Sequence, residues 1–415
     1  MLPEPATTER GHSGITSFTR HYWTFLFAEN LYDIGLYIFV LLYNLYLLDL
    51  GYREDFLGWV TSAMSIGSIA GALPAAAIAR RLGLKRTVIF GSAGVAVLCM
   101  CRTAALSHAW LMGTAFFAGA ISSVWAVSLV PTVAALTTEG NRALGYSLWT
   151  GWGIGLGVIM GAVAGSMTGW IRSSGFASSD ISARQIALLI GSATALLSPL
   201  LLVHLPLAKS GTAGAKVFPR SPFVMRFLVA YAVWNVGVGA FNPFFTAYFS
   251  RQLHMSTERI GFTFSAAQLA ELCALLLAPM MLRRFGNIRG IALMQAGVAL
   301  SLALLSIGPP AIAAGAIYAL FGSFQYMSEP ATFTLLMSRV SEDERAGASS
   351  LSFFITSAAQ AASAAVAGVS IVRFGYRPLL TFASLTTALA AWLFYCLLGE
   401  SKEKEPGRAA NANRT

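Results

Sequence analysis

The chain has 415 residues, of which 56% are hydrophobic and only 11% are charged. Soluble chains carry about 25% charged residues, so this composition argues against a soluble fold and indicates a polytopic membrane protein. The formal net charge of +10 does not indicate nucleic-acid binding, because the cations lie in short loops beside apolar runs, where the positive-inside bias explains them.

The amino-terminal stretch precedes every apolar run. Its first 20 residues are polar and lack the apolar core and the small-residue cleavage site of a signal peptide. We therefore expect the amino terminus to lie in the cytoplasm.

Apolar runs of about 18 to 28 residues follow, each long enough to cross a hydrocarbon core of about 30 Å as a helix. In the first half they cover residues 21–48, 56–79, 87–106, 110–136, 143–168 and 184–205. In the second half they cover residues 223–250, 258–282, 288–308, 310–337, 346–372 and 377–398. We predict an all-α polytopic membrane protein with twelve transmembrane helices.

Polar residues divide these runs into two sets. The stretch KSGTAGAKVFPRSP carries the glycines and prolines that are typical of a linker, and the charged residues after the last run are typical of a solvated tail. We predict a six-helix bundle over residues 1–208, a cytoplasmic linker over 209–222, a second six-helix bundle over 223–400 and a disordered cytoplasmic tail over 401–415.

The two sets are related by a tandem duplication. Residues 57–86, LGWVTSAMSIGSIAGALPAAAIARRLGLKR, recur at a constant offset as residues 260–289, with Gly83 matched by Gly286. A duplication of this kind predicts two pseudo-symmetric bundles.

The distribution of Lys and Arg predicts the orientation. With both termini in the cytoplasm, every lysine and most arginines fall on the cytoplasmic side of the twelve spans. We therefore expect a multi-pass protein of a prokaryote-like cytoplasmic (inner) membrane. Arg102 lies near the outer end of its span, where we expect it to snorkel to the interface.

Two six-helix halves, a cytoplasmic linker and the loop RLGLKR at residues 81–86 resemble the major facilitator superfamily. The resemblance implies a substrate cavity between the halves near the midplane, exposed alternately to each side, and repeats that rock about a fixed site agree with it. The loop positions that the resemblance and the repeat assign to a gate are Arg81, Gly83, Lys85, Arg86, Arg284, Gly286 and Arg289.

The chain departs from the family pattern in two places. Arg80 stands where the family loop has an acidic residue, so the role of that residue in a cytoplasmic lock does not carry over. The fifth span has the glycine stripe Gly153, Gly157, Gly161 and Gly165, but no proline follows its last two members, so the antiporter motif is incomplete. We expect the stripe to allow close helix packing rather than to contact a ligand.

Four carboxylates lie within spans: Glu29 and Asp33 in the first, Glu271 in the eighth and Glu329 in the tenth. An ionisable group in hydrocarbon costs about 2.5 to 3.5 kcal/mol, so each is expected to face protein or water. We expect one or two of them to gain and lose a proton as the cavity changes access. The alternative is a carboxylate held by hydrogen bonds between helices.

Polar and aromatic residues at similar depth form the candidate substrate lining. They are Asn30, Tyr37, Asn44, Trp125, Trp149, Trp234, Asn235, Asn242, Gln268, Gln325, Tyr326 and Gln360. Acidic groups beside aromatic rings suit a cationic or amphiphilic solute through charge and cation–π attraction.

The sequence predicts a transporter and not an enzyme, with no cofactor, no metal site and no nucleic-acid partner, because the histidines and cysteines form no catalytic or metal-ligand pattern. We expect a monomer in the lipid bilayer that moves a small organic molecule by alternating access, as a proton-coupled antiporter for efflux. The alternatives are proton symport of a sugar-like or other polar nutrient, and a membrane sensor that binds without transport.

Overall fold

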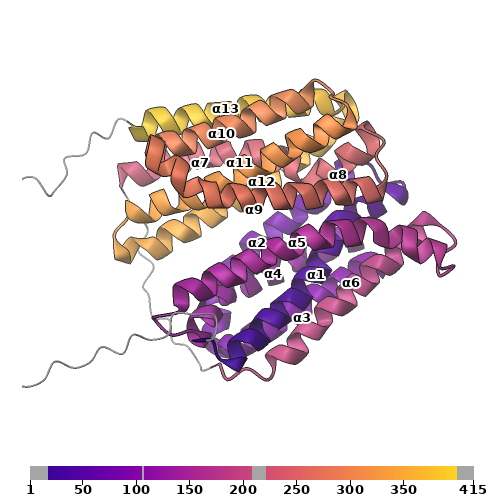
Figure 1. Ribbon diagram of the computed structural model, residues 1–415, viewed down its shortest axis with the longest axis horizontal. Coiled ribbons are helices and arrows are strands. Elements are labelled where there is room, and N and C mark those ends of the chain that lie inside the picture. Colours follow the sequence, from indigo (N-terminus) through magenta and orange to yellow (C-terminus); the bar gives the residue numbers. More distant parts are fainter. Residues whose placement is uncertain (1–16, 105–106, 208–220, 400–415) are drawn as a thin grey trace, which may run out of the picture.

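The computed structural model describes residues 17–104, 107–207 and 221–399, so most of the predicted linker and all of the predicted tail lie outside the described residues (Figure 1). The first half contains α1 (Arg20–Asp49), α2 (Glu54–Leu82), α3 (Leu84–Ala104), α4 (His108–Leu136), α5 (Arg142–Ser173) and α6 (Asp180–Leu202). The second half contains α7 (Pro222–Phe241), η2 (Asn242–Phe244), α8 (Phe245–Ala247), η3 (Tyr248–Gln252), α9 (Thr257–Phe285), α10 (Asn287–Ser306), α11 (Ala311–Ser338), α12 (Glu342–Phe374) and α13 (Tyr376–Gly399). No strand occurs in this described part of the chain.

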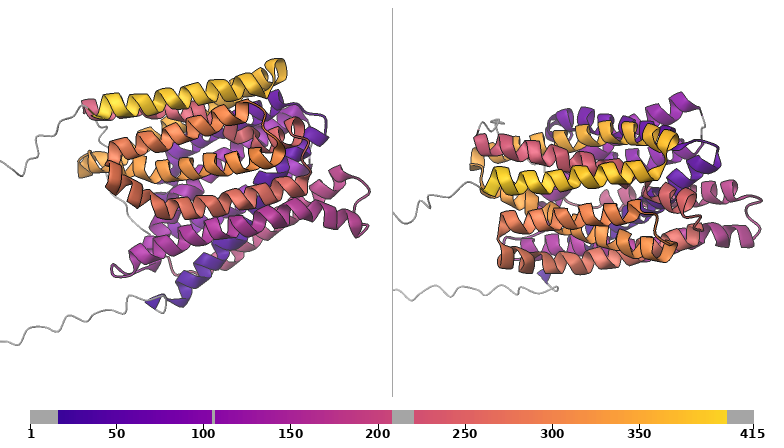
Figure 2. Two further views of the ribbon diagram at one scale, coloured as in Figure 1. Left: turned by 45° about the horizontal axis from the view of Figure 1, so that its top comes forward. Right: turned by 90° about the horizontal axis from the view of Figure 1, so that it is seen from above.

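The long helices confirm an all-α polytopic membrane protein. In the part of the chain that the structure describes, ten helical stretches are long and apolar enough to cross a membrane, and α2 and α11 are not among them. Figure 1 shows the helices of the first half, from α1 to α6, gathered in the lower part of the view and those of the second half, from α7 to α13, in the upper part, and in the left view of Figure 2 the second half comes forward over part of the first.

The helix count differs from the prediction, because the seventh span is not one continuous helix. The described residues hold thirteen α-helices rather than twelve, since α7 ends at Phe241 and a 3₁₀ turn, the short α8 and the π-helical η3 complete the span. Pro243 lies in the 3₁₀ turn and has no amide hydrogen to donate to the preceding turn of helix. The proline therefore interrupts the backbone hydrogen bonds of the seventh span, which was expected to be one continuous helix.

The two halves meet along two seams, α2 against α12 and α5 against α9. At the first seam a Cβ added to Gly58 would collide with the carbonyl oxygen of Ala364. At the second, a Cβ added to Gly261 would collide with the carbonyl oxygen of Gly161. Gly261 is the repeat partner of Gly58, and Ala364 is the repeat partner of Gly161, so the duplication produces both seams from one pattern of small residues.

The repeat also places equivalent helix ends. Gly83 follows α2 with φ 81° and Gly286 follows α9 with φ 79°, and each donates its amide to a carbonyl four residues earlier. A positive φ favours glycine because it has no Cβ. The glycine of each predicted gating loop is therefore required by the turn that ends the preceding helix.

Among the described residues, the large cluster of buried hydrophobic side chains that joins the two halves lies toward one end of the molecule. One large cluster combines residues of both halves, among them Leu48 at the end of α1 and Tyr376 at the beginning of α13. At the other end, a cluster around Phe25 lies within the first half and a separate cluster around Phe227 lies within the second. We call the end where α1 finishes and α2 begins the closed end, and the opposite one the divided end.

Candidate functional site

The first part of the candidate site lies where α1, α5 and α9 meet. The Tyr37 hydroxyl donates a hydrogen bond of 3.0 Å to the Gly153 carbonyl oxygen on α5. One turn further along α5, a Cβ at Gly157 would lie 2.8 Å from the Tyr37 hydroxyl oxygen and 2.9 Å from Gln268 Oε1. The glycine therefore lets a tyrosine of the first half and a glutamine of the second approach each other through the seam.

Gln268 contacts the buried carboxylate of Glu271. Its Nε2 donates to Glu271 Oε2 at 2.9 Å, and the two residues are only 5% and 4% exposed. The other Glu271 oxygen lies so close to Gly322 on α11 that an added Cβ would collide with it. Glu271 is thus fixed between a hydrogen-bond donor on its own helix and a close backbone contact on the next.

A second glutamine and glutamate pair lies on α11. Gln325 Nε2 donates to Glu329 Oε1 at 2.9 Å, and Gln325 Oε1 accepts from Asn242 Nδ2 at 3.4 Å. Unlike Glu271, Glu329 is exposed. Tyr326, on the same helix, lies near both glutamates.

Tyr326 links the two parts of the site. It lies near Gln268 and Tyr37 as well as near Glu271 and Glu329. We name these six residues the central cluster: Tyr37, Gln268, Glu271, Gln325, Tyr326 and Glu329. The cluster brings carboxylates, amides and two aromatic rings together, and its members come from both halves.

The carboxylates of α1 lie in different surroundings. Glu29 is 1% exposed, and its Oε1 has no hydrogen-bond partner among the described residues. The rings of Tyr32 and Trp125 lie 4.3 Å apart, centroid to centroid, and the Trp125 indole N–H is also without a partner in the described part of the chain. Asp33 is partly exposed and faces α5, where its Oδ2 would be 3.5 Å from a Cβ at Gly153.

Apart from Asn242, which donates to Gln325, the remaining predicted lining residues make no hydrogen bond with the central cluster among the described residues. Asn44 donates to the Pro243 carbonyl oxygen at 2.7 Å, and Asn235 donates to the Tyr231 carbonyl oxygen of its own helix at 2.7 Å. Trp234 is 2% exposed within the hydrophobic cluster that joins the halves. Three further predicted residues are half-buried, and none of the hydrogen bonds described for the cluster involves them: Asn30, Trp149 and Gln360.

The predicted gating loops lie at the divided end. Arg81 and Arg86 are exposed, and the Arg284 guanidinium lies over the Phe285 ring at 5.5 Å from its centroid. Within the described residues no ion pair joins the two loops, where Lys85 and Arg289 provide the other cations.

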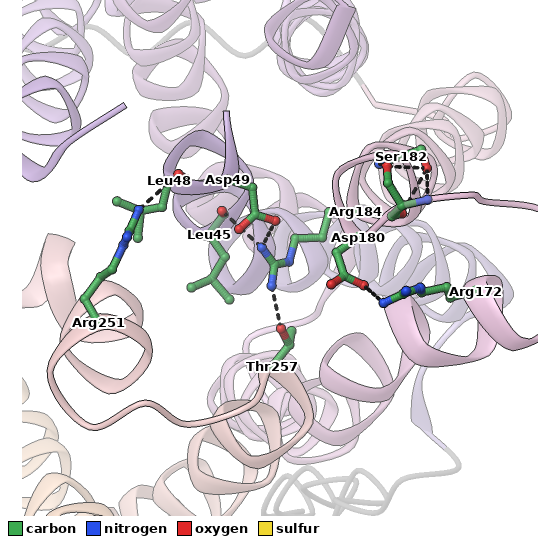
Figure 3. A network of polar contacts seen from close by, with 10 residues as sticks. Leu45, Leu48, Asp49, Arg172, Asp180, Ser182, Arg184, Arg251 and Thr257 are labelled. Atoms are coloured by element: carbon green, nitrogen blue, oxygen red, sulfur yellow. Dashed lines mark hydrogen bonds and ion pairs between the residues drawn. The ribbon is translucent and has the colours of Figure 1, made fainter. Parts of the chain in front are cut away.

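Sequence reasoning missed a polar network at the closed end (Figure 3). Arg184 of α6 pairs with Asp49 of α1, donates to the Leu45 carbonyl oxygen at 3.2 Å and donates to Thr257 Oγ1 of α9 at 2.9 Å. Arg251 donates to the Leu48 carbonyl oxygen at 3.1 Å. These contacts hold the halves together. From the sequence, both arginines were interpreted only as charges on the outer side of the membrane.

The expectation for Arg102 was wrong. Its side chain does not snorkel, because the residue is 5% exposed and its guanidinium lies 4.2 Å from the Tyr43 ring centroid and 5.0 Å from that of Phe39. Two aromatic rings of α1 cover a cation that the sequence placed near the membrane surface.

Two groups of membrane-length helices around a polar centre, joined at one end and separated at the other, define the class of multi-pass membrane transporters. A sequence profile of the Major Facilitator Superfamily matches residues 25–363 and 223–414, so the chain belongs to this family. It is therefore a transporter and not an enzyme, as the sequence predicted.

Solved transporters share the fold at low sequence identity. The nucleoside transporter NupG aligns with a TM-score of 0.75 at 14% identity, over 92% of this chain and 99% of that one. A bacterial homologue of the iron transporter ferroportin in an inward-facing state aligns with a TM-score of 0.71 at 14% identity, over 90% of this chain and 98% of that one. A POT family transporter in complex with a thioalcohol-conjugated peptide aligns with a TM-score of 0.76 at 12% identity, over 94% of this chain and 98% of that one. No curated protein matches the sequence.

Proposed function

We propose that the chain is a proton-coupled secondary transporter that exports a cationic or amphiphilic small molecule by alternating access. The observation that carries the proposal is the position of Gln268. Its amide donates to Glu271, and its oxygen lies opposite Gly157 of α5, beside the Tyr37 hydroxyl of the first half. Movement of α5 against α9 would therefore change the surroundings of the Glu271 carboxylate. Protonation and movement of the two halves are thereby linked.

The chemistry of the central cluster supports a cationic solute. Glu271 and Glu329 supply negative charge, while Tyr37 and Tyr326 supply rings for cation–π attraction. Both glutamates accept hydrogen bonds from neutral glutamines, and neither takes part in an ion pair found among the described residues. Asp33, facing α5, is proposed as a further proton-binding group, and Glu29 as a buried one.

The proposal includes the topology. Counting the broken helix from α7 to η3 as one crossing gives twelve spans, six in each bundle, with both termini in the cytoplasm of an inner membrane. With that orientation the closed end faces outward and the divided end faces the cytoplasm, so the conformation is inward-open. Arg81 and Arg284 then lie at the open mouth, where the proposed gating loops would meet on closure.

The glutamines favour a second candidate, proton symport of a neutral polar nutrient. Gln268, Gln325 and Asn242 offer amide donors and acceptors of the kind that bind hydroxyl groups. In this alternative the proton and the solute would move in the same direction.

Purified protein in proteoliposomes with an internal pH dye tests the proposal. Tetraphenylphosphonium, sugars and organic acids are added in turn to wild-type protein, to Glu271→Gln and to Glu258→Gln, an exposed control on the same helix. We expect the lipophilic cation to drive proton movement in the opposite direction in wild type and in the control, and none in Glu271→Gln. Proton movement in the same direction as a sugar would favour symport, and cation transport without any proton movement would contradict coupling.

A further inference from the structure

The groove between α9 and α11 at the closed end has no part in the transport scheme. It has a volume of about 570 Å³, and its lining includes Arg259 and Phe262 of α9 and Ile312, Gly315 and Ala316 of α11. Ligand pockets commonly have volumes of about 300 to 1,000 Å³, so the groove is large enough to hold part of a small amphiphile.

Small residues make this surface concave. Ile312 on α11 is 91% exposed and Phe262 on α9 is 52% exposed, and both side chains line the groove. Gly315 and Ala316 lie on α11, where a larger side chain would fill the space. Both helices are long enough to cross a membrane, and the exposed lining residues other than Arg259 are apolar, so we expect the groove to open toward the bilayer.

One cation lies among these apolar residues. Arg259 is exposed near the beginning of α9, and it takes part in neither of the ion pairs found among the described residues. Its sequence neighbour Glu258 lines a different cavity, between α5, α6 and α9, together with Arg172 and Arg184. The charge of Arg259 is thus available to an anion at the level where a membrane helix begins.

We propose that this groove binds a glycerophospholipid with a net negative headgroup, one acyl chain lying between Phe262 and Ile312 and the phosphate against Arg259. Basic residues beside spaces between membrane helices recognise anionic headgroups in this way. A second groove, between α7, α12 and α13, provides a contrast within the same molecule. It is lined by residues such as Val236, Val366 and Phe382 and contains no cation, so no headgroup preference is expected there.

Lipid retention measured by native mass spectrometry tests the proposal. Phosphatidylglycerol and phosphatidylcholine with identical acyl chains are offered at equal concentration to the protein in detergent. One arginine near an anionic headgroup accounts for about a fivefold preference, so wild type should retain phosphatidylglycerol about fivefold better. Arg259→Gln should remove the preference, whereas Arg377→Gln, an exposed arginine at the beginning of α13, should keep it.

Ala316→Phe tests the groove itself, because its ring would occupy the space of the acyl chain. Retention of both lipids should fall in this variant. Equal retention of the two lipids by wild type, or a preference that survives Arg259→Gln, would overturn the proposal.

A photolabel on wild-type protein gives an answer that does not depend on variant folding. Phosphatidylglycerol with a diazirine in its acyl chain should label peptides that contain Phe262 or Ile312 more strongly than those that contain Val366. Equal labelling of the two grooves would overturn the proposal, as would a dimer crosslinked through Ile312, which would assign this face to a second copy.

Discussion

The Arg184 guanidinium, on α6 of the first half, donates a hydrogen bond of 2.9 Å to the Thr257 hydroxyl, at the beginning of α9 in the second half. The same guanidinium pairs with Asp49 of α1. One side chain therefore connects three helices at the closed end (Figure 3). In a protein that opens and closes, this contact has to break whenever the closed end opens.

Arg184→Gln is expected to favour the alternative conformation, in which the two halves separate at the end that is closed in this structure. A hydrogen bond to a charged group contributes about 1.5 to 3 kcal/mol, so the ratio of the two conformations should change about tenfold or more. Spin labels at the exposed residues Ser174 and Gln252, one in each half, would report the change as a longer distance between them.

Arg172→Gln is the matched control for this shift. Arg172 pairs with Asp180 at 2.6 Å, but both residues belong to the first half and more than half of each side chain is exposed. The control should leave the label distance unchanged. An equal shift in both variants would show that loss of any closed-end arginine, rather than the contact across the seam, opens the molecule.

Gly165→Leu is expected to abolish transport by preventing closure. A Cβ at Gly165 would lie 2.8 Å from Gly261 Cα and 3.0 Å from the Thr257 carbonyl oxygen, and backbone atoms cannot move aside as side chains can. Overpacking costs about 1 to 3 kcal/mol, which here opposes only the conformation with α5 against α9. Gly169→Leu, one turn further along α5 with nothing within 4 Å, should transport normally. Normal uptake by Gly165→Leu in proteoliposomes would refute the role of this contact.

Gly322→Ala is expected to displace the Glu271 carboxylate and to weaken proton coupling. The carboxylate lies against Gly322, so a methyl group there overfills a buried site and should lower the free energy of unfolding by about 1 to 3 kcal/mol. Adding Glu271→Asp shortens the acidic side chain and should recover part of the loss in stability. Thermal unfolding in detergent checks both variants, and a double variant no more stable than Gly322→Ala would argue against a steric cause.

The sequence predicted the helices well because membrane spans are long, apolar and bounded by charge. Each predicted span overlaps a helical segment of the structure, and two glycines of the α5 stripe, Gly161 and Gly165, pack against Gly261 as predicted. The break at Pro243 was not predicted, because a proline in a membrane helix is also compatible with a bend. Pro131 and Pro330 lie inside continuous helices, and the residues alone do not distinguish the three cases.

The candidate site was predictable only in part. Their positions inside apolar runs identified Glu271 and Glu329 as carboxylates within spans, but the packing of helices far apart in the sequence, such as Gly322 of α11 against Glu271, could not be predicted. Gly157 and Gly322 shape the cluster by having no side chain; the sequence assigned Gly157 only to helix packing and gave no sign of Gly322. Arg184 and Arg102 were misjudged for the same reason, since only the fold brings a distant partner to a charge.

Arg102→Lys is expected to destabilise the first half, although the charge is kept. The planar guanidinium lies over Tyr43 and Phe39, and a lysine ammonium is a compact, strongly hydrated charge that cannot stack in this way. Cation–π contacts contribute about 0.5 to 2 kcal/mol, and we expect a loss within that range, measured by denaturant unfolding in detergent. Arg373→Lys, at an exposed position in the last turn of α12, should be neutral. If the two variants were equally stable, the aromatic rings would contribute burial alone and the guanidinium geometry would not matter.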